Sequence, residues 1–295
     1  MEPEPRTLRR IGLVVHHDRP LAKELAYRVL AWADSLGADV VMGESDAQVV
    51  GARSLAQDSE VLATADVVVA IGGDGTMLRA VRLVADAGVA LVAVHAGQLG
   101  YLADVAPERT EWALSELAAG RGRTEERMRL QAEIADGADA GVAAGQQRLS
   151  GLNEVVVERA LTGHTVRLRV FLDDRFFTSY VADGMVVATP TGSTAYAFSV
   201  RGPIVAPTHR ALVMVPVAPH LLFDRALVLE ADSAIELEVT GHRAATVTVD
   251  GQGGVAVPPG GRVRCTTAPQ PARFIRFEEH RFHEVLKRKF SLADR

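Results

Sequence analysis

Residues 67–78, which read VVVAIGGDGTML, constrain the fold of this 295-residue chain more than any other stretch. Residues 67–71 form a continuous apolar run rich in valine, which is typical of a strand buried on both faces of a parallel sheet. Three glycines within the next four positions allow a sharp turn, and a helical pattern begins at about Met77. A strand, a tight turn and a helix in this order predict an α/β domain.

The glycine turn is also the first candidate binding site. A helix N-terminus after such a turn offers unpaired N–H groups and the positive end of the helix dipole, so we expect it to bind phosphate. Asp74 needs another role, because a carboxylate repels phosphate. We expect it to hold a metal ion or to take a proton from an attacking hydroxyl; the alternative is that it caps the helix. The turn is not a Walker loop, because the chain contains no GxxxxGK[ST] sequence.

Strand and helix patterns alternate through the first 120 residues, which predicts a doubly wound parallel sheet covered by helices on both faces. Ligands bind beyond the carboxyl ends of such strands, where the loop at residues 95–102 also lies. His95 and Tyr101 are candidates to line that cleft, although Gly97 and Gly100 equally favour a purely structural turn at His95. We expect strands at residues 10–16, 38–42, 67–71 and 89–94, and helices at residues 21–36, about 77–87 and 107–117.

After Gly120 the pattern changes to short strands separated by Gly, Pro, Asp and Asn, which predicts a β-sandwich domain over residues 121–277. Its expected strands lie at residues 129–134, 155–158, 166–172, 176–181, 185–188, 227–229, 235–239, 245–249 and 263–267. The small, Gly-rich residues 135–145 are expected to form a hairpin tip. Residues 279–290 have helical spacing, so we expect a C-terminal helix within residues 278–295 that packs back on the first domain, residues 1–120.

Composition excludes several classes of partner. A formal net charge of −5 argues against nucleic acid or an anionic membrane as the main partner. No apolar run approaches the length that spans a bilayer, and the first ten residues lack the apolar core of a signal peptide. Cys265 is the only cysteine, so no intrachain disulfide can form, and we expect the protein in a reducing cytoplasm.

Two polar motifs stand out in the second domain. Asn153 and Glu154 precede an apolar strand pattern, where they can offer both donors and acceptors to ribose hydroxyls or an adenine edge; the alternative is a polar turn. Residues 182–196, ADGMVVATPTGSTAY, place three threonines and a serine in an uncharged loop suited to sugar hydroxyls and phosphate oxygens. Tyr196 can stack on a nucleotide. The alternative for this loop is an N-capping turn before a short helix at residues 195–199.

These motifs, in this order and at these separations, resemble the NAD kinase family. GGDGT alone is weak, since related loops occur in diacylglycerol kinases and phosphofructokinases, but DG…TPTGSTAY downstream of it is specific. The resemblance covers roughly residues 67–252. It extends to LGYLAD at 99–104, EERMRL at 125–130, GPIV at 202–205, PVAPH at 216–220 and DGQ at 250–252.

The resemblance implies an enzyme that transfers the γ-phosphoryl group of ATP, or of inorganic polyphosphate in some members, to the 2′-hydroxyl of the adenosine ribose of NAD. A divalent metal, usually Mg²⁺, is implied, although no metal ligand in the chain is assigned. The family fold joins an α/β domain to a β-sandwich domain, with the C-terminal helix returning to the first. Members are commonly homodimers or homotetramers, with the site completed across subunits.

The family motifs also suggest individual roles. Asp74 matches the proposed general base on the ribose hydroxyl. The expected phosphate or ATP ligands are Gly72, Gly73, Gly75, Thr76 and Arg79. The expected NAD ligands are Asp74, Gly75, Asn153, Glu154, Asp183, Thr191, Thr194, Ala195, Tyr196 and Gln252, with Asp183 on the nicotinamide side.

The chain departs from the family pattern at His95, where many members have Asn, and at Val200-Arg201, which replaces a small pair. These changes bear on substrate preference, since Asp74, Asn153 and Tyr196 are intact. A lipid or other small-alcohol kinase using the same GGDGT domain is one competing hypothesis, but the TPTGSTAY loop argues against it. A non-catalytic NAD(P) sensor is another. Formation of NADP from ATP, Mg²⁺ and NAD separates the three.

Overall fold

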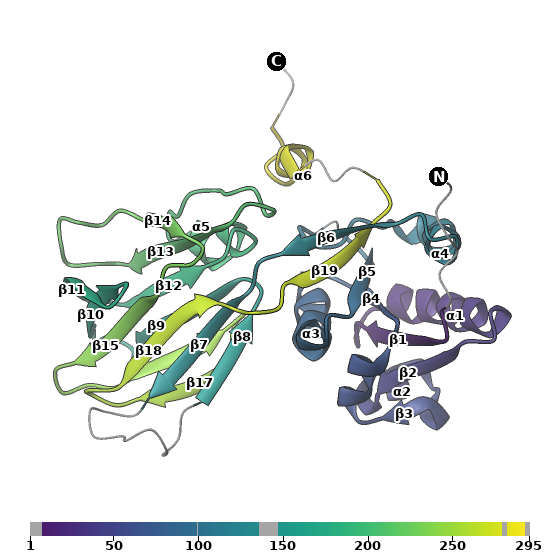
Figure 1. The fold of residues 1–295 in the computed structure, drawn as a ribbon, viewed down its shortest axis with the longest axis horizontal. Coiled ribbons are helices and arrows are strands. Elements are labelled where there is room, and N and C mark those ends of the chain that lie inside the picture. Colours follow the sequence, from purple (N-terminus) through teal and green to yellow (C-terminus); the bar gives the residue numbers. More distant parts are fainter. Residues whose placement is uncertain (1–7, 99, 136–146, 279–281, 293–295) are drawn as a thin grey trace. The chain divides into compact units, whose positions relative to one another are not determined.

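The computed structural model describes residues 8–98, 100–135, 147–278 and 282–292. The chain forms two compact units: unit 1 comprises Met1–Glu126 and Gln270–Arg295, and unit 2 comprises Arg127–Pro269 (Figure 1). The expected fold class, an α/β domain followed by a β-domain, is confirmed. Among the described residues, no helix is long and apolar enough to cross a membrane.

Unit 1 is built on a sheet with the strand order β3-β2-β1-β4-β5-β19-β6. The strands from β3 to β19 pair in parallel, and β1 lies between β2 and β4. The chain winds outward in both directions from β1, so the switch point of this doubly wound sheet lies between β1 and β4. The strands are β1 (Arg10–Val15), β2 (Asp39–Gly43), β3 (Ala56–Gln57), β4 (Val67–Gly72), β5 (Ala90–His95), β6 (Arg123–Arg127) and β19 (Ala272–Arg276).

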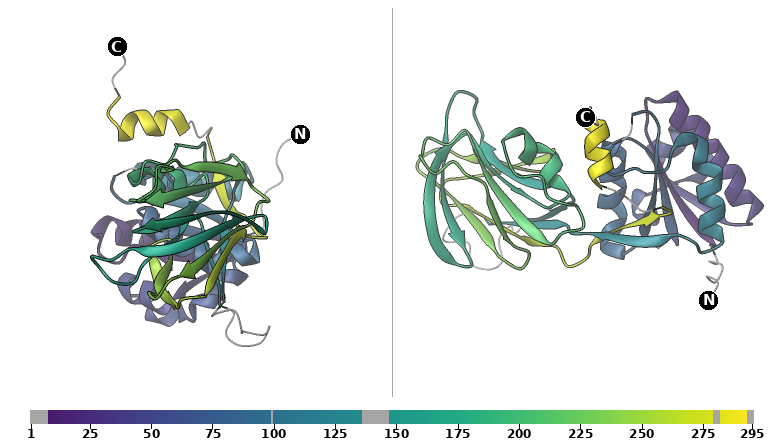
Figure 2. Two further views of the ribbon diagram at one scale, coloured as in Figure 1. Left: turned by 90° about the vertical axis from the view of Figure 1, so that its left-hand side faces the viewer. Right: turned by 90° about the horizontal axis from the view of Figure 1, so that it is seen from above.

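Helices cover both faces of this sheet, as the sequence predicts. Leu13 of β1 and Val69 of β4 pack with Leu25 and Leu114 of two helices, α1 and α4, in one buried cluster. Figure 2 shows α1 and α4 on one side of the sheet and α3 on the other. The helices are α1 (Pro20–Ser35), α2 (Glu44–Val50), α3 (Asp74–Val84), α4 (Thr110–Ala118) and α6 (Phe282–Lys289), with 3₁₀ helices η1 (Arg53–Leu55), η2 (Ser59–Thr64), η3 (Ala85–Ala87) and η4 (Pro107–Arg109).

Unit 2 is a β-sandwich of two antiparallel sheets, with the orders β11-β10-β15-β18-β7-β8 and β14-β13-β12-β9-β16-β17. Leu168 and Ile235 of the first sheet share one buried cluster with Val187 and Val247 of the second. The strands are β7 (Leu130–Ala135), β8 (Gln147–Gly151), β9 (Glu154–Arg159), β10 (Val166–Leu172), β11 (Arg175–Ala182), β12 (Gly184–Ala188), β13 (Ala211–Val217), β14 (Leu227–Glu230), β15 (Ile235–Thr240), β16 (Ala245–Val249), β17 (Gln252–Val257) and β18 (Arg262–Thr267). Two short helices, η5 (Gly192–Thr194) and α5 (Tyr196–Ser199), follow β12.

Several elements differ from the sequence-based expectation. Helix α3 begins at Asp74, with Gly73 as its N-cap, rather than at about residue 77. The sequence pattern indicates a later start because the first turn contains a glycine, which has a low helix propensity. Helix α2 and strands β3, β6, β8, β13, β17 and β19 were not expected, and β19 joins the sheet of unit 1. The expected hairpin tip lies outside the described residues, apart from residue 135. The C-terminal helix is described from Phe282 and groups with unit 1.

Candidate active site

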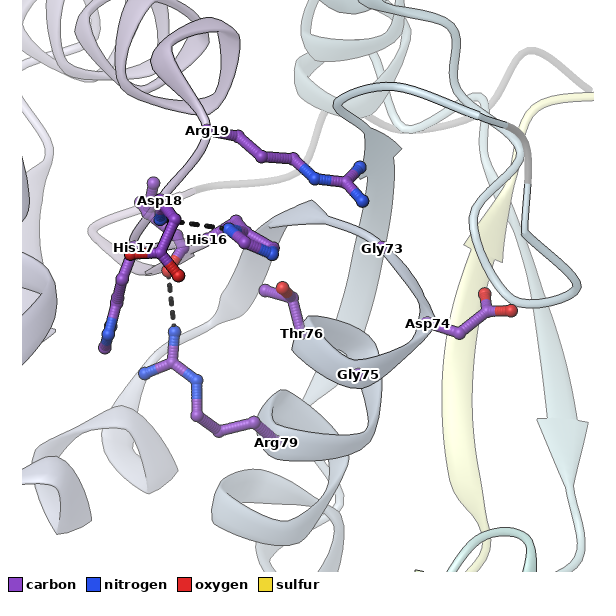
Figure 3. Close-up of a pocket in the computed structure, with 10 residues that line it drawn as sticks. His16, His17, Asp18, Arg19, Gly73, Asp74, Gly75, Thr76 and Arg79 are labelled. Carbon is purple, nitrogen blue, oxygen red and sulfur yellow. Dashed lines mark hydrogen bonds between the residues drawn. The ribbon is translucent and has the colours of Figure 1, made fainter.

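A cavity of about 420 Å³ opens where β1 and β4 end side by side. Val15 of β1 pairs with Ile71 of β4, so the segments that follow the two strands meet at this edge of the sheet. The cavity is lined by residues 15–19, residues 73–76 and Arg79 (Figure 3). It therefore lies at the N-terminus of α3, where unpaired N–H groups favour an anion.

Arg79, an expected phosphate ligand, lines this cavity but is already bonded within the protein. Its guanidinium donates to both carboxylate oxygens of Asp46 at 2.7 and 2.8 Å, and to the Val15 carbonyl at 2.7 Å. Asp46 is only 1% exposed and also accepts a hydrogen bond from the Val15 N–H at 2.9 Å. Arg79 thus neutralises a buried carboxylate and ties α3 to the end of β1, and its role as a phosphate ligand stays a prediction.

Asp74 does not cap α3, since Gly73 is the N-cap. Its two carboxylate oxygens instead accept hydrogen bonds from the N–H groups of Tyr101 and Leu102, at 3.0 and 3.1 Å. In Figure 3 the Asp74 carboxylate points away from His16, Thr76 and Arg79. These two donors fix the carboxylate and leave further lone pairs free for a substrate hydroxyl.

The loop that holds Asp74 depends on a glycine and on a buried arginine. A Cβ atom on Gly100 would overlap the Asp74 carboxylate, so only glycine allows this close approach. The Leu102 carbonyl accepts a hydrogen bond from Arg276 at 3.0 Å, and Arg276 also pairs with Asp104 at 2.8 Å and Glu125 at 3.1 Å. Burial raises the pKa of Asp104, and the Arg276 guanidinium acts in the opposite direction.

His95, expected either to line the cleft or to form a turn, makes a local contact. Its Nδ1 lies 2.9 Å from the Gly97 carbonyl, which fits the turn that the glycines favour. Several cavity residues were not singled out from the sequence: His16, His17, Asp18 and Arg19. The signal was present, because a polar HHDR run directly follows the apolar strand IGLVV, but the neighbour of that strand in the sheet could not be read from the sequence.

In unit 2 the two polar motifs meet. The Thr189 N–H donates to the Asn153 carbonyl at 2.9 Å, and the Thr189 hydroxyl donates to the Leu152 carbonyl at 2.6 Å. A Cβ atom on Gly192 would overlap the Asn153 carbonyl oxygen, so the glycine lets the threonine-rich loop lie directly on that segment. This contact brings Thr191, Thr194, Ala195 and Tyr196 into the same region as Asn153 and Glu154.

Asp250 fixes the Asn153-Glu154 segment, although of the DGQ motif at 250–252 only Gln252 was expected to bind a ligand. Its carboxylate accepts hydrogen bonds from the N–H groups of Leu152, Asn153 and Glu154, at 2.7, 2.7 and 3.1 Å. Burial raises the pKa of Asp250, and these backbone bonds act in the opposite direction. Gln252 is exposed at the start of β17, just beyond the turn that carries Asp250.

Glu154 is the least compensated of the expected ligands. It is 6% exposed, and its Oε2 atom has no hydrogen-bond partner among the described residues. Burial and the nearby Asp250 charge raise the pKa of Glu154 to about 7, against a hydrogen bond from the backbone of Tyr196. The buried Thr191 hydroxyl also lacks a partner within the described part of the chain. Two unsatisfied buried oxygens mark this region as a place for ligand donors.

Asp183, the expected ligand on the nicotinamide side, forms an ion pair with Arg159 of β9. Both side chains are about one-third exposed, at 32% and 31%. Arg159 ends strand β9, which begins at Glu154. The Arg159 N–H also donates a hydrogen bond to the Asp183 carbonyl at 2.9 Å. A ligand that approaches Asp183 therefore meets a carboxylate already paired with a cation.

Two family models match this chain. The ATP-NAD kinase N-terminal domain matches residues 11–122, and the ATP-NAD kinase C-terminal domain matches residues 152–277. The NAD kinase of Heliobacterium modesticaldum is 38% identical over 284 residues, which cover 95% of this chain and 97% of that protein. The NAD kinase of Moorella thermoacetica is 34% identical over 283 residues, which cover 96% and 89%.

The chain belongs to the NAD kinase family. It is therefore a kinase enzyme, as the motifs predict. Its fold also matches the yeast NADH kinase solved with NADH, with a TM-score of 0.87, 20% identity and 99% and 89% of the two chains covered. An NAD kinase from Archaeoglobus fulgidus solved with ATP gives a TM-score of 0.73 at 24% identity, with 96% and 100% covered.

We predict that Gly100→Ala will lower kinase turnover by at least about 10-fold, because the new methyl group displaces the loop that orients Asp74. Turnover and thermal unfolding should be measured together. The expected variant is folded but slow. Wild-type turnover in Gly100→Ala would contradict a dependence of the site on this close approach.

We predict that Glu154→Gln will stabilise the protein increasingly as the pH rises from 5 to 8. The folded-state pKa of about 7 exceeds the usual 4.5, so the free energy of unfolding falls as pH rises through this window. Glutamine does not titrate, so the variant should gain up to about 3 kcal/mol over wild type above pH 7 and little below pH 5. Denaturant unfolding at several pH values measures this gain.

The half-buried Glu158 lies on the same strand as Glu154 and provides the matched control. Glu158→Gln shows what the same substitution does at a less buried position of the strand. A pH-independent difference between wild type and Glu154→Gln would show that burial of Glu154 does not shift its titration.

Proposed function

We propose that this enzyme phosphorylates the 2′-hydroxyl of the adenosine ribose of NAD to give NADP, with ATP or inorganic polyphosphate as the phosphoryl donor and Mg²⁺ or another divalent metal. The observation that carries the proposal is the Asp74 carboxylate, held by two backbone N–H groups next to a helix N-terminus that favours phosphate. A base and an anion site on one turn are what transfer of a phosphoryl group to an alcohol requires. The names of the relatives and the ligands of the two similar structures support NAD and ATP.

Asp74 acts in this proposal as the general base. A ribose hydroxyl is a weak nucleophile at neutral pH, and a fixed carboxylate that accepts its proton as the bond to phosphorus forms lowers the barrier. The N–H groups of Tyr101 and Leu102 keep both oxygens in place, so that little reorganisation is needed.

The unit 2 residues bind the dinucleotide in this proposal. Glu154 and Thr191 offer buried oxygens that lack hydrogen-bond partners among the described residues, so hydroxyl or amino donors of a nucleoside can satisfy them. Asn153 offers both a donor and an acceptor, and Tyr196, which is 37% exposed, offers a ring face for stacking.

The divalent metal fits only in part. Within the described residues there is no group of three or more His, Cys, Asp or Glu side chains placed to hold an ion. Mg²⁺ is commonly bound by one or two carboxylates together with substrate phosphates and water. The metal is therefore proposed to be held mainly by the phosphate oxygens of the donor, whose charge it neutralises.

The purified protein, incubated with NAD, ATP and MgCl₂, should form NADP, which an NADP-specific dehydrogenase detects and which phosphorus NMR distinguishes from the 3′-phosphate. Excess EDTA should abolish the product, and Mg²⁺ should restore it. Polyphosphate in place of ATP tests the alternative donor. A 3′-phosphorylated product, or full activity in EDTA, would contradict the proposal.

We predict that Asp74→Asn will lower kcat by at least about 100-fold while NAD still binds, since the amide cannot take the hydroxyl proton. The amide NH₂ will also face one of the two N–H groups of the loop, so a loss of about 1–3 kcal/mol of stability is expected. Calorimetric titration with NAD and thermal unfolding separate these effects. Turnover close to that of wild type would remove Asp74 from the role of base.

A further inference from the structure

We propose that Arg19 binds the phosphate groups of the phosphoryl donor through the N–H donors of its guanidinium that the protein leaves unused. The inference rests on the proposed function, because it assigns a ligand to the same site. Under this inference the cation that binds the phosphate groups is Arg19 rather than Arg79.

The backbone fold places the Arg19 guanidinium beside the glycine turn. Arg19 is the N-cap of α1, just after the end of β1. Its Nη1 atom donates to the Ala96 carbonyl at 2.6 Å, which holds the side chain across the carboxyl ends of the strands. A Cβ atom on Gly73 would lie 3.8 Å from Nη2 and 3.9 Å from Nη1. Figure 3 shows the guanidinium reaching toward the turn at Gly73.

The two arginines of the cavity differ in how their charge is used. Arg79 donates three hydrogen bonds, two of them to the buried Asp46 carboxylate. Arg19 donates one, to a neutral carbonyl, and within the described part of the chain it forms no ion pair. A guanidinium has five N–H donors. Within the described residues Arg19 uses one of them and keeps four for a ligand, whereas Arg79 uses three.

The two histidines of the cavity are weaker candidates for the phosphate ligand than Arg19. Burial lowers the pKa of His16, and the nearby Arg19 charge lowers it further. The His17 Nε2 atom lies 3.4 Å from the Asp46 carboxylate, which also pairs with Arg79. A guanidinium with four spare N–H donors suits the oxygens of a phosphate chain, and the N–H groups at the start of α3 also line the cavity.

Inorganic tripolyphosphate is the probe for this site, since it carries the phosphate chain without nucleoside or turnover. Its Kd should be measured by calorimetry for wild type, Arg19→Met and Arg19→Lys. We expect Arg19→Met to weaken binding by about 10-fold or more and to reduce its salt dependence. The Kd of Arg19→Lys should lie between those of wild type and Arg19→Met, because lysine keeps the positive charge but lacks the paired N–H donors of a guanidinium.

Arg28→Met is the matched control, because Arg28 lies on the same helix and pairs with Glu24 outside the cavity. It should bind tripolyphosphate within about twofold of wild type. In kinase assays, Arg19→Met should raise KM for ATP and leave KM for NAD unchanged.

The outcomes separate the possible roles of Arg19. If Arg19 only anchors the segment after β5, Arg19→Met will unfold at lower temperature and bind tripolyphosphate like wild type, which overturns the inference. Unchanged affinity in both Arg19 variants also overturns it. Should the protein fail to make NADP while Arg19→Met still weakens tripolyphosphate binding, the proposed reaction fails and the anion site stands.

Discussion

The two hydrogen bonds that the Asp74 carboxylate accepts from the loop after β5 are the contacts on which the candidate site of unit 1 depends. They join the start of α3 to residues that lie 27 and 28 positions further along the chain. The same loop is held from behind by Arg276, which comes from β19 near the end of the chain. Three separate segments must therefore be in place before one carboxylate is oriented.

Arg276 can do this because two carboxylates pair with its buried charge, although its Nη2 atom has no hydrogen-bond partner among the described residues. A charge taken out of water costs several kcal/mol unless it is paired and hydrogen-bonded. Arg276 is 1% exposed and meets two carboxylates and a carbonyl, so removal of any partner leaves a buried group unsatisfied. In unit 2 a buried negative charge plays the corresponding part. The Asp250 carboxylate is buried and accepts hydrogen bonds from three N–H groups of the segment that carries Asn153 and Glu154. Glu154 itself is left less compensated, as is common where a site awaits a ligand.

The elements that the sequence predicted are those specified by local patterns. The buried run of β4, the helical spacing of α1 and the alternation of β7 each follow from periodicity within a dozen residues. Helix α2 was missed because its seven residues, ESDAQVV, are too short and too polar for a clear period. Strand β19 was missed because its membership in the sheet of unit 1 depends on pairing with β5, which lies far away in sequence.

In the candidate site, too, local patterns were readable from the sequence and long-range contacts were not. Motifs indicated Asp74, Asn153 and the threonine-rich loop as candidate site residues, but they could not reveal that Arg79 is bonded to Asp46, which lies 33 positions earlier. Nor could they point to Arg19, because its place beside the glycine turn follows from the parallel pairing of β1 with β4. Long-range partners decide which of two arginines is available, and a single sequence does not contain that information directly.

The structure also bears on a question raised by the sequence alone, which is why a carboxylate occurs inside a turn that is expected to bind phosphate. Asp74 occupies the first position of α3, and its side chain points away from the cavity toward the N–H groups of Tyr101 and Leu102 (Figure 3). Arg19 faces the same turn from the cavity. The tight turn at Gly72–Gly75 thus keeps the Asp74 carboxylate on the opposite side from the cavity that is expected to bind phosphate. Because the backbone turns within a few residues, the carboxylate and a bound phosphate can lie close in sequence without their negative charges facing each other.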